Sequence, residues 1–488
     1  MNVTVVGGGL AGLATALRLA ERGYRVTLYE RRRMLGGNVG SRESGFDIYP
    51  HMYLNWYRNF WALLGVDRAA RFRPMQGIKQ LAPGQYPRFT GLERPYMPQT
   101  VLKNVFGGVE PPADLYLFFY ASIDLMAERL APTGLLDDVS VNGFLRARPY
   151  MTERAAAFFD NFIINVWAVP SYLASAGDYR DFLEYSIADP TPPFWLARGS
   201  AQSQVIAPIE AQLKAAGVRL RRSTEVVSVS CADGRVTEIG LGNGRTERVD
   251  QLVLAVPPAA LVTLARAGEQ PIVAAAPRLA ELSRLRAQRV PLVNVMFKRR
   301  LPVPAEPVGL QASTYGLAFT DISQTWPDLD GPTVLALSSS DPYGLPGTDD
   351  DADAAAMVRE LATYLNAGEE DIERSSYEPN RDALLFVNET GSDQWRPPAQ
   401  VDGLENLWLA GDYTDNRIGM TTIESAVTSG LEAAQAIVSR HGGEPVEILQ
   451  PRTLPRALWV WLRYACIPYA ASASLWSKGS DLLKRLQR

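Results

Sequence analysis

Four residues near the start of the chain have the types and spacing of a phosphate and sugar site: Gly7, Gly9, Gly12 and Glu30. Glycines at this GxGxxG spacing allow a tight turn, a close approach of the backbone to a pyrophosphate, and close packing of a helix on a strand. An acidic residue about twenty positions further on can accept hydrogen bonds from a ribose hydroxyl. The pattern predicts a bound dinucleotide, and the alternative is a glycine-rich turn that holds no ligand.

The elements that must position these residues are also predicted by the sequence. Residues 3–6 form a short run rich in β-branched side chains, which is typical of a strand, and residues 26–29 form a second run just before Glu30. Between them, apolar residues recur at helical spacing from Leu10 to Leu19. This order of strand, turn, helix and strand would point the free N–H groups of the helix start at the phosphates.

Two further motifs favour a flavin over a nicotinamide. The pair Gly36–Gly37 follows the acidic residue, and a nicotinamide-binding domain has no need of it. Near the other end of the chain, an apolar strand at 407–410 runs into Gly411–Asp412, and a helix is predicted to start near Met420–Thr421. Asp412 can hold the ribityl or pyrophosphate part of the cofactor. The helix start can face the pyrimidine edge of the flavin, where charge builds up on reduction.

With these motifs the chain resembles the FAD-dependent amine oxidase and carotenoid desaturase superfamily. Within it, the chain most resembles plant and cyanobacterial phytoene and ζ-carotene desaturases, with squalene-associated desaturases nearby. The matching segments are VVGGGLAGLATALRLAERGYRVTLYERRRMLGG, FDIYPHMY, LVLAVPP, VNVMFKRRL and LWLAGDYT…IESAVTSGLEAAQAI. The resemblance implies FAD as the cofactor. The positions that it implies in binding FAD are Gly7, Gly9, Leu10, Ala11, Gly12, Glu30, Arg31, Gly36, Gly37, Asn38, Val226, Gly411, Asp412, Met420, Thr421 and Thr422.

The resemblance also implies the chemistry, in which a hydride leaves a saturated carbon for flavin N5 and a proton leaves the neighbouring carbon. We expect two catalytic residues: His51 as a proton acceptor or polarising group, and Arg299 as a substrate-site or charge-stabilising residue. The alternatives are a structural hydrogen bond for His51 and a salt-bridged strand end for Arg299. Lys298 is expected on the surface, although amine oxidases of the superfamily usually place a lysine near N5. Asp47 is expected to make structural hydrogen bonds, and Asn38 replaces the arginine or lysine that is common after the glycine pair.

The composition excludes several classes of function. The 488 residues carry a net charge of −4, which gives no general affinity for nucleic acid. Cys231 and Cys466 make no disulfide framework, and with only two histidines beside them they cannot build a zinc site, so that we expect no metal. The chain begins almost directly in a strand, and no signal peptide is expected.

The expected fold class is α/β, with a Rossmann-like FAD-binding domain that is discontinuous in sequence and an inserted α+β substrate domain. We predict FAD-binding pieces at 1–74, 199–262 and 404–440. The substrate domain would combine 75–198, which is mostly helical, with 263–403. The aromatic residues of the first insertion are expected either in the core or as the lining of a hydrophobic tunnel.

The last segment, 441–488, is rich in aromatic and basic residues. From Arg452 on it holds seven basic residues and one acidic residue, and its longest uncharged run, from Tyr464 to Ser477, has 14 residues. That run is short for a membrane span. Aromatic and cationic side chains together suit a segment that lies on an anionic bilayer surface. Packing against the protein body and a true span are the alternatives.

Three functions fit these observations. The favoured one is an FAD-dependent desaturase or dehydrogenase that acts on a long hydrophobic isoprenoid or polyene, with quinone or oxygen as electron acceptor. The second is an amine oxidase-like enzyme for a small amine, and the third is an FAD-dependent isoprenoid isomerase or dehydroxylase. A flavin-binding scaffold without catalysis is a further alternative. For the favoured function we expect a cytoplasmic protein that is peripheral on the inner face of the cell membrane; the sequence leaves the oligomeric state open.

Overall fold

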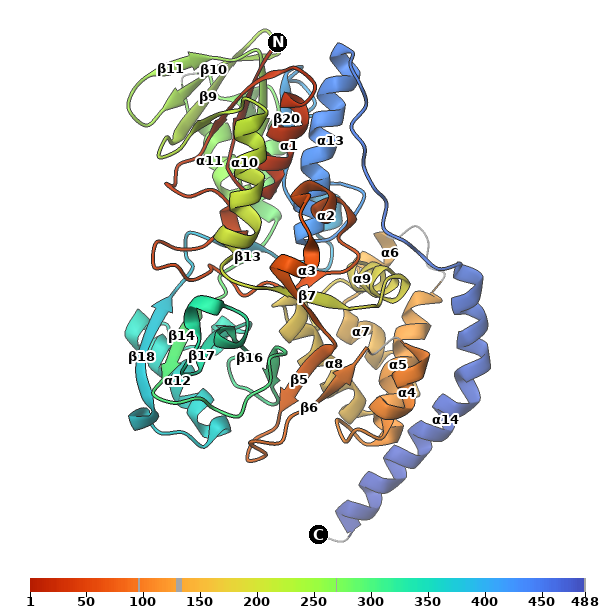
Figure 1. Cartoon of the computed structure of the whole chain (residues 1–488). Helices are drawn as coiled ribbons and strands as arrows, with labels where there is room; N and C mark the ends of the chain where they lie inside the picture. Colours follow the sequence, from red (N-terminus) through yellow and green to blue (C-terminus); the bar gives the residue numbers. More distant parts are fainter. Residues whose placement is uncertain (95–96, 129–133, 269, 487–488) are drawn as a thin grey trace.

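A five-stranded parallel sheet organises the half of the molecule that holds the N-terminus (Figure 1). The computed structural model describes residues 1–94, 97–128, 134–268 and 270–486. The sheet takes its strands from three separate parts of the chain. In spatial order they are β20 (Leu407–Leu409), β12 (Gln251–Leu254), β1 (Asn2–Val6), β2 (Arg25–Tyr29) and β8 (Arg219–Arg221). This arrangement confirms the predicted α/β class with a Rossmann-like sheet.

The two faces of this sheet are covered differently. Alternate side chains of each strand enter different cores: Val253 packs with the helices, whereas Leu252 and Leu254 pack on the opposite side. The helices on the first face are α1 (Leu10–Ala20), α10 (Ala207–Ala215) and α13 (Ile423–His441). The second face carries α11 (Pro258–Arg266) and an antiparallel sheet of β9 (Val226–Ala232), β10 (Arg235–Leu241) and β11 (Thr246–Arg248).

A second, seven-stranded sheet lies in the other half of the molecule and joins the two predicted insertions. Its first insertion strands are β5 (Gly77–Leu81) and β6 (Thr90–Glu93). The second insertion supplies β14 (Leu292–Phe297), β15 (Val308–Leu310), β16 (Leu317–Asp321), β17 (Val334–Ser339), β18 (Ile372–Glu378) and the covering helix α12 (Asp350–Leu365). The spatial order is β18-β14-β17-β16-β15-β5-β6, and the parallel pair β15–β5 connects the two insertions.

The remainder of the first insertion is a helical layer. Its helices are α4 (Pro98–Val105), α5 (Pro112–Met126), α6 (Gly134–Asp137), α7 (Val141–Arg146), α8 (Glu153–Trp167) and α9 (Ala176–Ala188). Phe118 of α5 is fully buried against Phe158 and Phe159 of α8, so that these aromatic residues belong to the core. Phe162 and Phe182 instead line a cavity. The core role is therefore confirmed for Phe118, Phe158 and Phe159, and the tunnel stays a prediction.

A small antiparallel sheet lies where the two halves meet (Figure 1). Its middle strand, β7 (Phe194–Ala197), pairs with β3 (Tyr53–Leu54) and β4 (Phe72–Met75). Short elements surround it: α2 (Arg58–Leu64), α3 (Arg68–Arg71), and the pair β13 (Ala287–Gln288) and β19 (Leu385–Phe386). Because β7 closes the first insertion and β3 follows the glycine motifs, this sheet connects the predicted cofactor site with the substrate side.

The C-terminal segment ends in one long helix, α14 (Arg456–Leu486), which packs along α5 at the edge of the molecule (Figure 1). Its inward face is anchored by polar contacts, including an ion pair of 2.7 Å between Arg463 Nε and Asp124 Oδ1 and a hydrogen bond of 2.6 Å from Ser477 Oγ to Asp114 Oδ1. Within the described part of the chain, no helix is both long and apolar enough to span a membrane.

Candidate active site

The predicted glycine motif lies at the carboxyl edge of the parallel sheet, between β1 and α1. A Cβ on Gly7 would come within 2.2 Å of the carbonyl oxygen of Ala255, and one on Gly12 within 2.0 Å of the carbonyl oxygen of Gly7. Packing by itself therefore requires glycine at both positions, whether or not a ligand binds there. Gly9 differs, because the nearest atom to an added Cβ is 3.8 Å away. The space over Gly9 is open at the start of α1, where free N–H groups can receive an anion.

The second glycine pair lies directly against the first motif. The N–H of Gly36 donates to the carbonyl of Gly8 at 2.8 Å, and a Cβ on Gly37 would lie 2.9 Å from the Cα of Gly9. Gly36 and Gly37 have φ angles of 122° and 57°, which favour glycine. The pair thus extends the phosphate cradle with a second strip of backbone free of side chains.

Glu30 is fixed at the same edge by backbone donors. Its Oε2 accepts from the N–H of Gly8 at 2.7 Å and its Oε1 from the N–H of Arg32 at 2.8 Å, and the residue is 9% exposed. The carboxylate is therefore held next to the glycine turn, where the lone pairs that remain can accept from ribose hydroxyls.

The C-terminal motif follows β20 at the same edge of the sheet. The N–H of Gly411 donates to Ser429 Oγ at 2.9 Å, and burial raises the pKa of Asp412 to about 6. Met420 is fully buried, and Thr421 donates its N–H to Asn388 Oδ1 at 2.6 Å. Thr422 caps α13 by accepting the N–H of Ser425 at 3.0 Å. The loop thus leads into a capped start of α13, a helix that packs along α1.

A buried arginine that the sequence did not point to holds this loop. Arg396 is 5% exposed and donates to the carbonyl oxygens of Asp412 at 2.8 Å, of Thr414 at 3.3 Å and of Gly419. One guanidinium therefore bridges both ends of the 411–420 loop. No local motif marks Arg396 in the sequence QWRPPA, because its role depends on carbonyl groups that only the fold brings together.

The remaining predicted cofactor residues lie around this edge in different roles. Leu10 and Ala11 are buried in the first turn of α1, and Val226 is buried at the start of β9. Arg31 and Asn38 instead reach the 382–384 segment: Arg31 donates to the carbonyl of Asp382 at 3.4 Å, and Asn38 to that of Leu384 at 2.8 Å. Those two side chains connect the glycine region with the substrate side.

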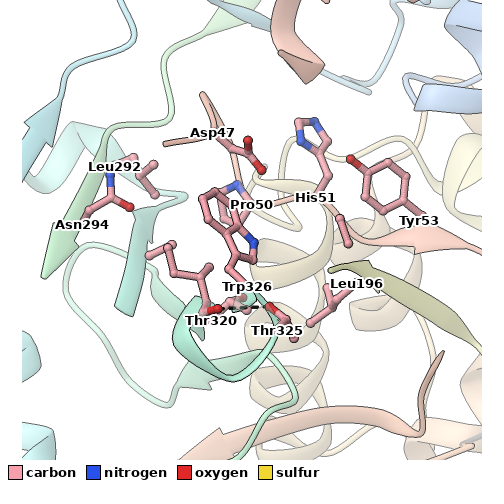
Figure 2. A pocket seen from close by; sticks show the side chains of 13 residues that line it. Asp47, Pro50, His51, Tyr53, Leu196, Leu292, Asn294, Thr320, Thr325 and Trp326 are labelled. Atoms are coloured by element: carbon pink, nitrogen blue, oxygen red, sulfur yellow. Dashed lines mark hydrogen bonds between the residues drawn. The ribbon is translucent and has the colours of Figure 1, made fainter. Parts of the chain in front are cut away.

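A pocket with both polar and apolar lining residues, which we call the inner pocket, opens beside the segment that follows the second glycine pair (Figure 2). Asp47 and His51 line it from that segment, and Asn294 lines it from β14 (Figure 2). The amide Nδ2 of Asn294 is buried and has no hydrogen-bond acceptor among the described residues. The remaining lining residues are Pro50, Tyr53, Leu196, Ala197, Leu292, Thr320, Ile322, Thr325, Trp326 and Ala336.

Asp47 and His51 differ in their readiness to take a proton. Asp47 Oδ1 accepts from Ser41 Oγ at 2.7 Å and from the N–H of Ala201 at 2.8 Å, while burial raises its pKa to about 7. Burial lowers the pKa of His51 to about 4. Its Nδ1 lies 2.9 Å from the carbonyl of Tyr49, so that Nδ1 carries the hydrogen and Nε2 is an acceptor. At neutral pH, the carboxylate is the stronger base of the two.

A second cavity, the outer pocket, lies along the same small sheet and is apolar. Residues of β3 and β7 contribute to both pockets: Tyr53 and Leu196 line the inner pocket, and Leu54 and Phe194 line the outer pocket. Most of the other lining residues are apolar, and they are Met52, Gly77, Ile78, Gln80, Leu92, Arg94, Phe162, Val166, Phe182, Ser186, Pro190 and Pro193. Phe194 and Leu196 lie on the same side of β7 and pack together, so the two pockets adjoin along this strand.

Arg299 and Lys298 lie outside both pockets. The Arg299 side chain is 60% exposed and pairs with Asp371 at 3.5 Å, and Lys298 Nζ donates to the carbonyl of Glu370 at 2.6 Å. Both residues follow the end of β14, beyond Phe297. The structure thus brings His51 to the inner pocket but does not bring Arg299 to it.

Comparison with known proteins accounts for this arrangement. The model of the flavin containing amine oxidoreductase family matches residues 10–438, which is most of the chain. The chain belongs to this family. It is therefore an FAD-dependent oxidoreductase, as the motifs predicted, and FAD is its cofactor.

Curated relatives and solved structures agree with this assignment. The 15-cis-phytoene desaturase of Solanum lycopersicum is 23% identical over 90% of this chain and 78% of its own length. The carotenoid φ-ring synthase of Streptomyces griseus is 26% identical over 90% of this chain and 88% of its own. An oxidoreductase from Methanosarcina mazei has a TM-score of 0.68 at 14% identity, over 88% of this chain and 99% of that one. Putrescine oxidase bound to putrescine has a TM-score of 0.63 at 17% identity, over 90% of this chain and 100% of that one. The solved structures show that the fold is shared.

The residues at the sheet edge fit FAD. The open space over Gly9 and the strip of backbone at Gly36–Gly37 suit a pyrophosphate, and Glu30 suits a ribose. At the start of α13, Thr421 Oγ1 is buried without a hydrogen-bond partner among the described residues, and this orphan hydroxyl suits a polar edge of the cofactor. Reasoning from the sequence found the glycines and the acid but missed Arg396 and Asn294.

Proposed function

We propose that this FAD-dependent oxidoreductase is a desaturase or dehydrogenase that acts on CH–CH bonds of a long hydrophobic isoprenoid or polyene. The observation that carries the proposal is the pair of pockets that share β3 and β7. An apolar chain can lie in the outer pocket against Leu54, Phe162 and Phe194. Its reacting carbons would then lie in the inner pocket beside Asp47 and His51.

Within the inner pocket we assign the proton acceptor to Asp47. Bound FAD supplies the two-electron acceptor for the hydride. A base works best when its pKa is near the working pH, and Asp47, at about 7, meets that condition better than His51, at about 4. His51 Nε2 remains free to accept a hydrogen bond and so to orient a donor group. Asn294 Nδ2 remains free to donate a hydrogen bond to an oxygen or nitrogen acceptor.

The relatives support the substrate class. Two curated relatives that each align over 90% of this chain are named for phytoene and for a carotenoid ring, which are both products of long isoprenoid chemistry. A substrate of this kind has no charged group to bind. This property agrees with the lining of the outer pocket, where the charged side chain is Arg94 and most of the others are apolar.

The long helix α14 supports a membrane surface as the place where such a substrate is taken up. On its inward face, Arg463, Ser477 and Asp481 contact acidic or basic partners on α5 and α8, and Trp459 and Ala470 are buried beside them. Its outer face is apolar, with Trp461 65% and Trp476 75% exposed. The other large apolar side chains exposed on this face are Leu458, Tyr464, Ile467, Tyr469, Leu475, Leu482 and Leu483. A helix that is held to the protein body and exposes many large apolar side chains suits contact with a bilayer.

This surface continues on a neighbouring helix. On α4, Leu102 is 70% exposed, and Phe106 just beyond its end is 74% exposed. Both α4 and α14 contact α5, and α4 also contacts β6, which lines the outer pocket through Leu92. We infer that the protein is peripheral on the inner face of the cell membrane, on the cytoplasmic side, and that a membrane quinone or oxygen accepts the electrons.

The test is the visible spectrum of the purified protein under anaerobic conditions. Phytoene, ζ-carotene and squalene would be offered in liposomes, with putrescine and a larger amine as the contrast. Bleaching of the flavin band by a polyene, with a product that has lost hydrogen, is expected. Bleaching by amines alone would overturn the proposal in favour of an amine oxidase. A rearranged lipid product without net bleaching would overturn it in favour of an isomerase or dehydroxylase.

The amine oxidase alternative is favoured by the fold shared with putrescine oxidase but not by the pockets. In the superfamily such enzymes usually carry a lysine near N5, and no described lysine lines either pocket. Lys298 is exposed, as expected from the sequence. The apolar lining of the outer pocket also offers few groups that could bind an ammonium ion.

A further inference from the structure

A cluster of three carboxylates lies outside both pockets and joins three separate segments. Asp137 ends α6, Asp178 lies in the first turn of α9, and Asp393 begins the short helix η9 (Asp393–Trp395). Helices α6 and α9 lie side by side (Figure 1). One carboxylate oxygen from each of the three residues lies within 4.8 Å of the other two. Asp137 and Asp178 are 3% and 4% exposed, whereas the side chain of Asp393 is 36% exposed.

These carboxylates lack the donors that buried charges require. Oδ1 of Asp137 and Oδ2 of Asp178 are buried, and neither accepts a hydrogen bond from the residues that the structure describes. An unpaired oxygen of this kind is costly unless a positive charge faces it. Arg396 pairs with Asp393 at 3.4 Å, but its other bonds go to carbonyl groups of the 411–420 loop.

The spacing of the oxygens fits a hard divalent cation. Ca²⁺ and Mg²⁺ bind carboxylate oxygens at about 2.0 to 2.6 Å, so that two oxygens on one ion are at most about 5 Å apart. The three oxygens of the cluster meet this condition. A set made of oxygens alone suits Ca²⁺, Mg²⁺ or Mn²⁺ better than Zn²⁺. Asp393 leaves a way in from solvent, because it is the partly exposed member of the three.

We propose that Asp137, Asp178 and Asp393 bind one divalent cation that joins the helical layer to the segment before the FAD loop. The backbone already holds the ligands in place, which favours a formed site over three carboxylates that merely lie near one another. The N–H of Asp393 donates to Asp137 Oδ2 at 3.1 Å, and the N–H of Gly391 donates to the carbonyl of Asp137 at 3.0 Å. The expectation from the sequence that no metal binds considered histidine and cysteine ligands, and this set contains neither.

The proposed ion would act on FAD through Arg396. Asp393 and Arg396 lie in one short segment and pair with each other, and Arg396 donates to the carbonyl groups of the FAD loop. An ion that fixes Asp393 therefore also fixes the position from which Arg396 holds this loop. Loss of the ion should speed the release of FAD without changing any residue that lines a pocket.

The test uses the full-length holoenzyme, dialysed against EDTA and then freed of the chelator. Ca²⁺, Mg²⁺ and Mn²⁺ would be added separately at 1 mM, with bound metal measured by elemental analysis, melting temperature by FAD fluorescence, and FAD release by filtration. For the wild type we expect about one bound ion per chain, a melting temperature higher by at least about 3 °C, and slower FAD release with one of the ions.

Two variants separate the proposed site from binding elsewhere. Asp178→Asn keeps the shape of the side chain, and we expect it to bind the ion at least tenfold more weakly and to lose the thermal shift. Asp330→Asn, at a position where the carboxylate is 88% exposed, should behave like the wild type. A wild type that binds none of the three ions would overturn the proposal and indicate a shared proton in the cluster. Unchanged stoichiometric binding by both Asp178→Asn and Asp137→Asn would equally overturn it.

Discussion

The FAD edge and the inner pocket differ in how strongly the backbone restricts their residues. At the FAD edge, Gly7 and Gly12 could not carry a Cβ without meeting a carbonyl oxygen within 2.2 Å. In the inner pocket, Asp47, His51 and Asn294 come from two distant parts of the chain, and the roles proposed for them depend on the chemistry of their side chains. A site formed by the backbone restricts the residue types at a fixed spacing, and this pattern can be found in the sequence. A site formed by side chains from distant segments has no such spacing, so no local pattern marks its residues.

The largest effect is expected at Gly9, the glycine of the FAD edge where an added side chain would meet open space and not a carbonyl oxygen. Gly9→Val would place a side chain in the open space over the glycine turn, and no protein atom lies within 3.8 Å of the added Cβ. The chain should therefore still fold, while FAD binding falls by more than about 100-fold because the pyrophosphate is blocked. Flavin content after purification and the affinity for added FAD measure this loss.

The matched control is Gly479→Ala in α14, where an added Cβ also meets no atom within 4 Å. It should keep a full complement of FAD. If Gly9→Val bound FAD as well as this control, the pyrophosphate could not lie over Gly9, and the assignment of the FAD edge would be wrong.

The next largest effect is expected at Arg396, whose side chain holds the 411–420 loop through hydrogen bonds to its carbonyl groups. Arg396→Leu would leave the carbonyl group of Gly419 without its donor in a buried place, and that of Asp412 with Ser425 Oγ at 3.3 Å. We expect a loss of about 3 kcal/mol in the free energy of unfolding and a weaker grip on FAD. Denaturant unfolding followed by flavin fluorescence measures both. Arg417→Gln, whose side chain is 51% exposed beside Glu432, is the control and should cost less than about 1 kcal/mol.

The sequence predicted the FAD edge because its constraints are local. The run from Gly7 to Glu30 holds a strand, a turn, a helix and a second strand within one segment, and each residue type has one role there. The pair Gly36–Gly37 was also found, although its contact with Gly8 and Gly9 shows that it serves the packing of two turns as well. The fold class followed from the same segments, since parallel strands with helices between them form one kind of sheet.

The substrate side could not be predicted as far because its residues meet only after folding. Arg299 was chosen from the resemblance to the desaturases, but β14 ends at Phe297 and the side chain pairs with Asp371 at the surface. Asn294, on the same strand, lies in the inner pocket instead, since residues on one strand alternate between faces. Nothing local separates these two positions, and the register of the seven-stranded sheet decides between them.

A third prediction asks whether Asp47 is a base or a structural group. Asp47→Asn keeps the oxygen that accepts from Ser41 and Ala201, so that the fold should survive. We expect the rate of flavin reduction by a polyene to fall at least about 100-fold, as for the loss of a general base. In the wild type this rate should rise with pH through about 7, as the carboxyl group loses its proton, and the variant should lack this rise.

The stability of the same variant supplies a second readout. The pKa of Asp47 is raised to about 7 in the folded state, above its usual value of 3.8, so that the native state holds a proton that the unfolded chain has lost. The wild type should therefore become less stable as the pH rises from about 4 to about 7, and Asp47→Asn should lose this dependence. Glu43→Gln, an exposed acid on the same segment, should leave both profiles unchanged. A wild-type rate that is flat across neutral pH would assign Asp47 a structural role only.

A fourth prediction concerns the two faces of α14. Trp461→Ser, Trp476→Ser and Leu483→Ser together remove large side chains that are 59% exposed or more, so that the fold should lose little. Sedimentation with anionic vesicles should fall at least about tenfold, because these groups would bury apolar area in the interface. Val227→Ser, an exposed apolar residue on β9, should leave sedimentation unchanged. Unreduced sedimentation of the triple variant would show that another surface binds the bilayer.

Substitutions on the exposed face are a cleaner test than removal of everything after Arg440. The start of that segment belongs to the body of the protein: Leu449 accepts a hydrogen bond of 2.8 Å from Asn59 Nδ2, and Trp459 is 5% exposed. Truncation after Arg440 would expose α5 and its buried acids Asp114 and Asp124. Loss of membrane binding in such a protein would not distinguish a missing anchor from a damaged fold.

The smallest effect is expected at Arg299. This residue lies in a segment that resembles the desaturases, but its side chain lies outside both pockets. Arg299→Gln removes a charge that is 60% exposed and an ion pair of 3.5 Å, which should change the free energy of unfolding by less than about 0.5 kcal/mol. The rate of flavin reduction should change less than about twofold, against the loss of at least about 100-fold at Asp47. Stopped-flow reduction of both variants under one condition makes the comparison. A large loss at Arg299 would mean that this strand end moves to the substrate during the reaction, and the inner pocket would then have to include it.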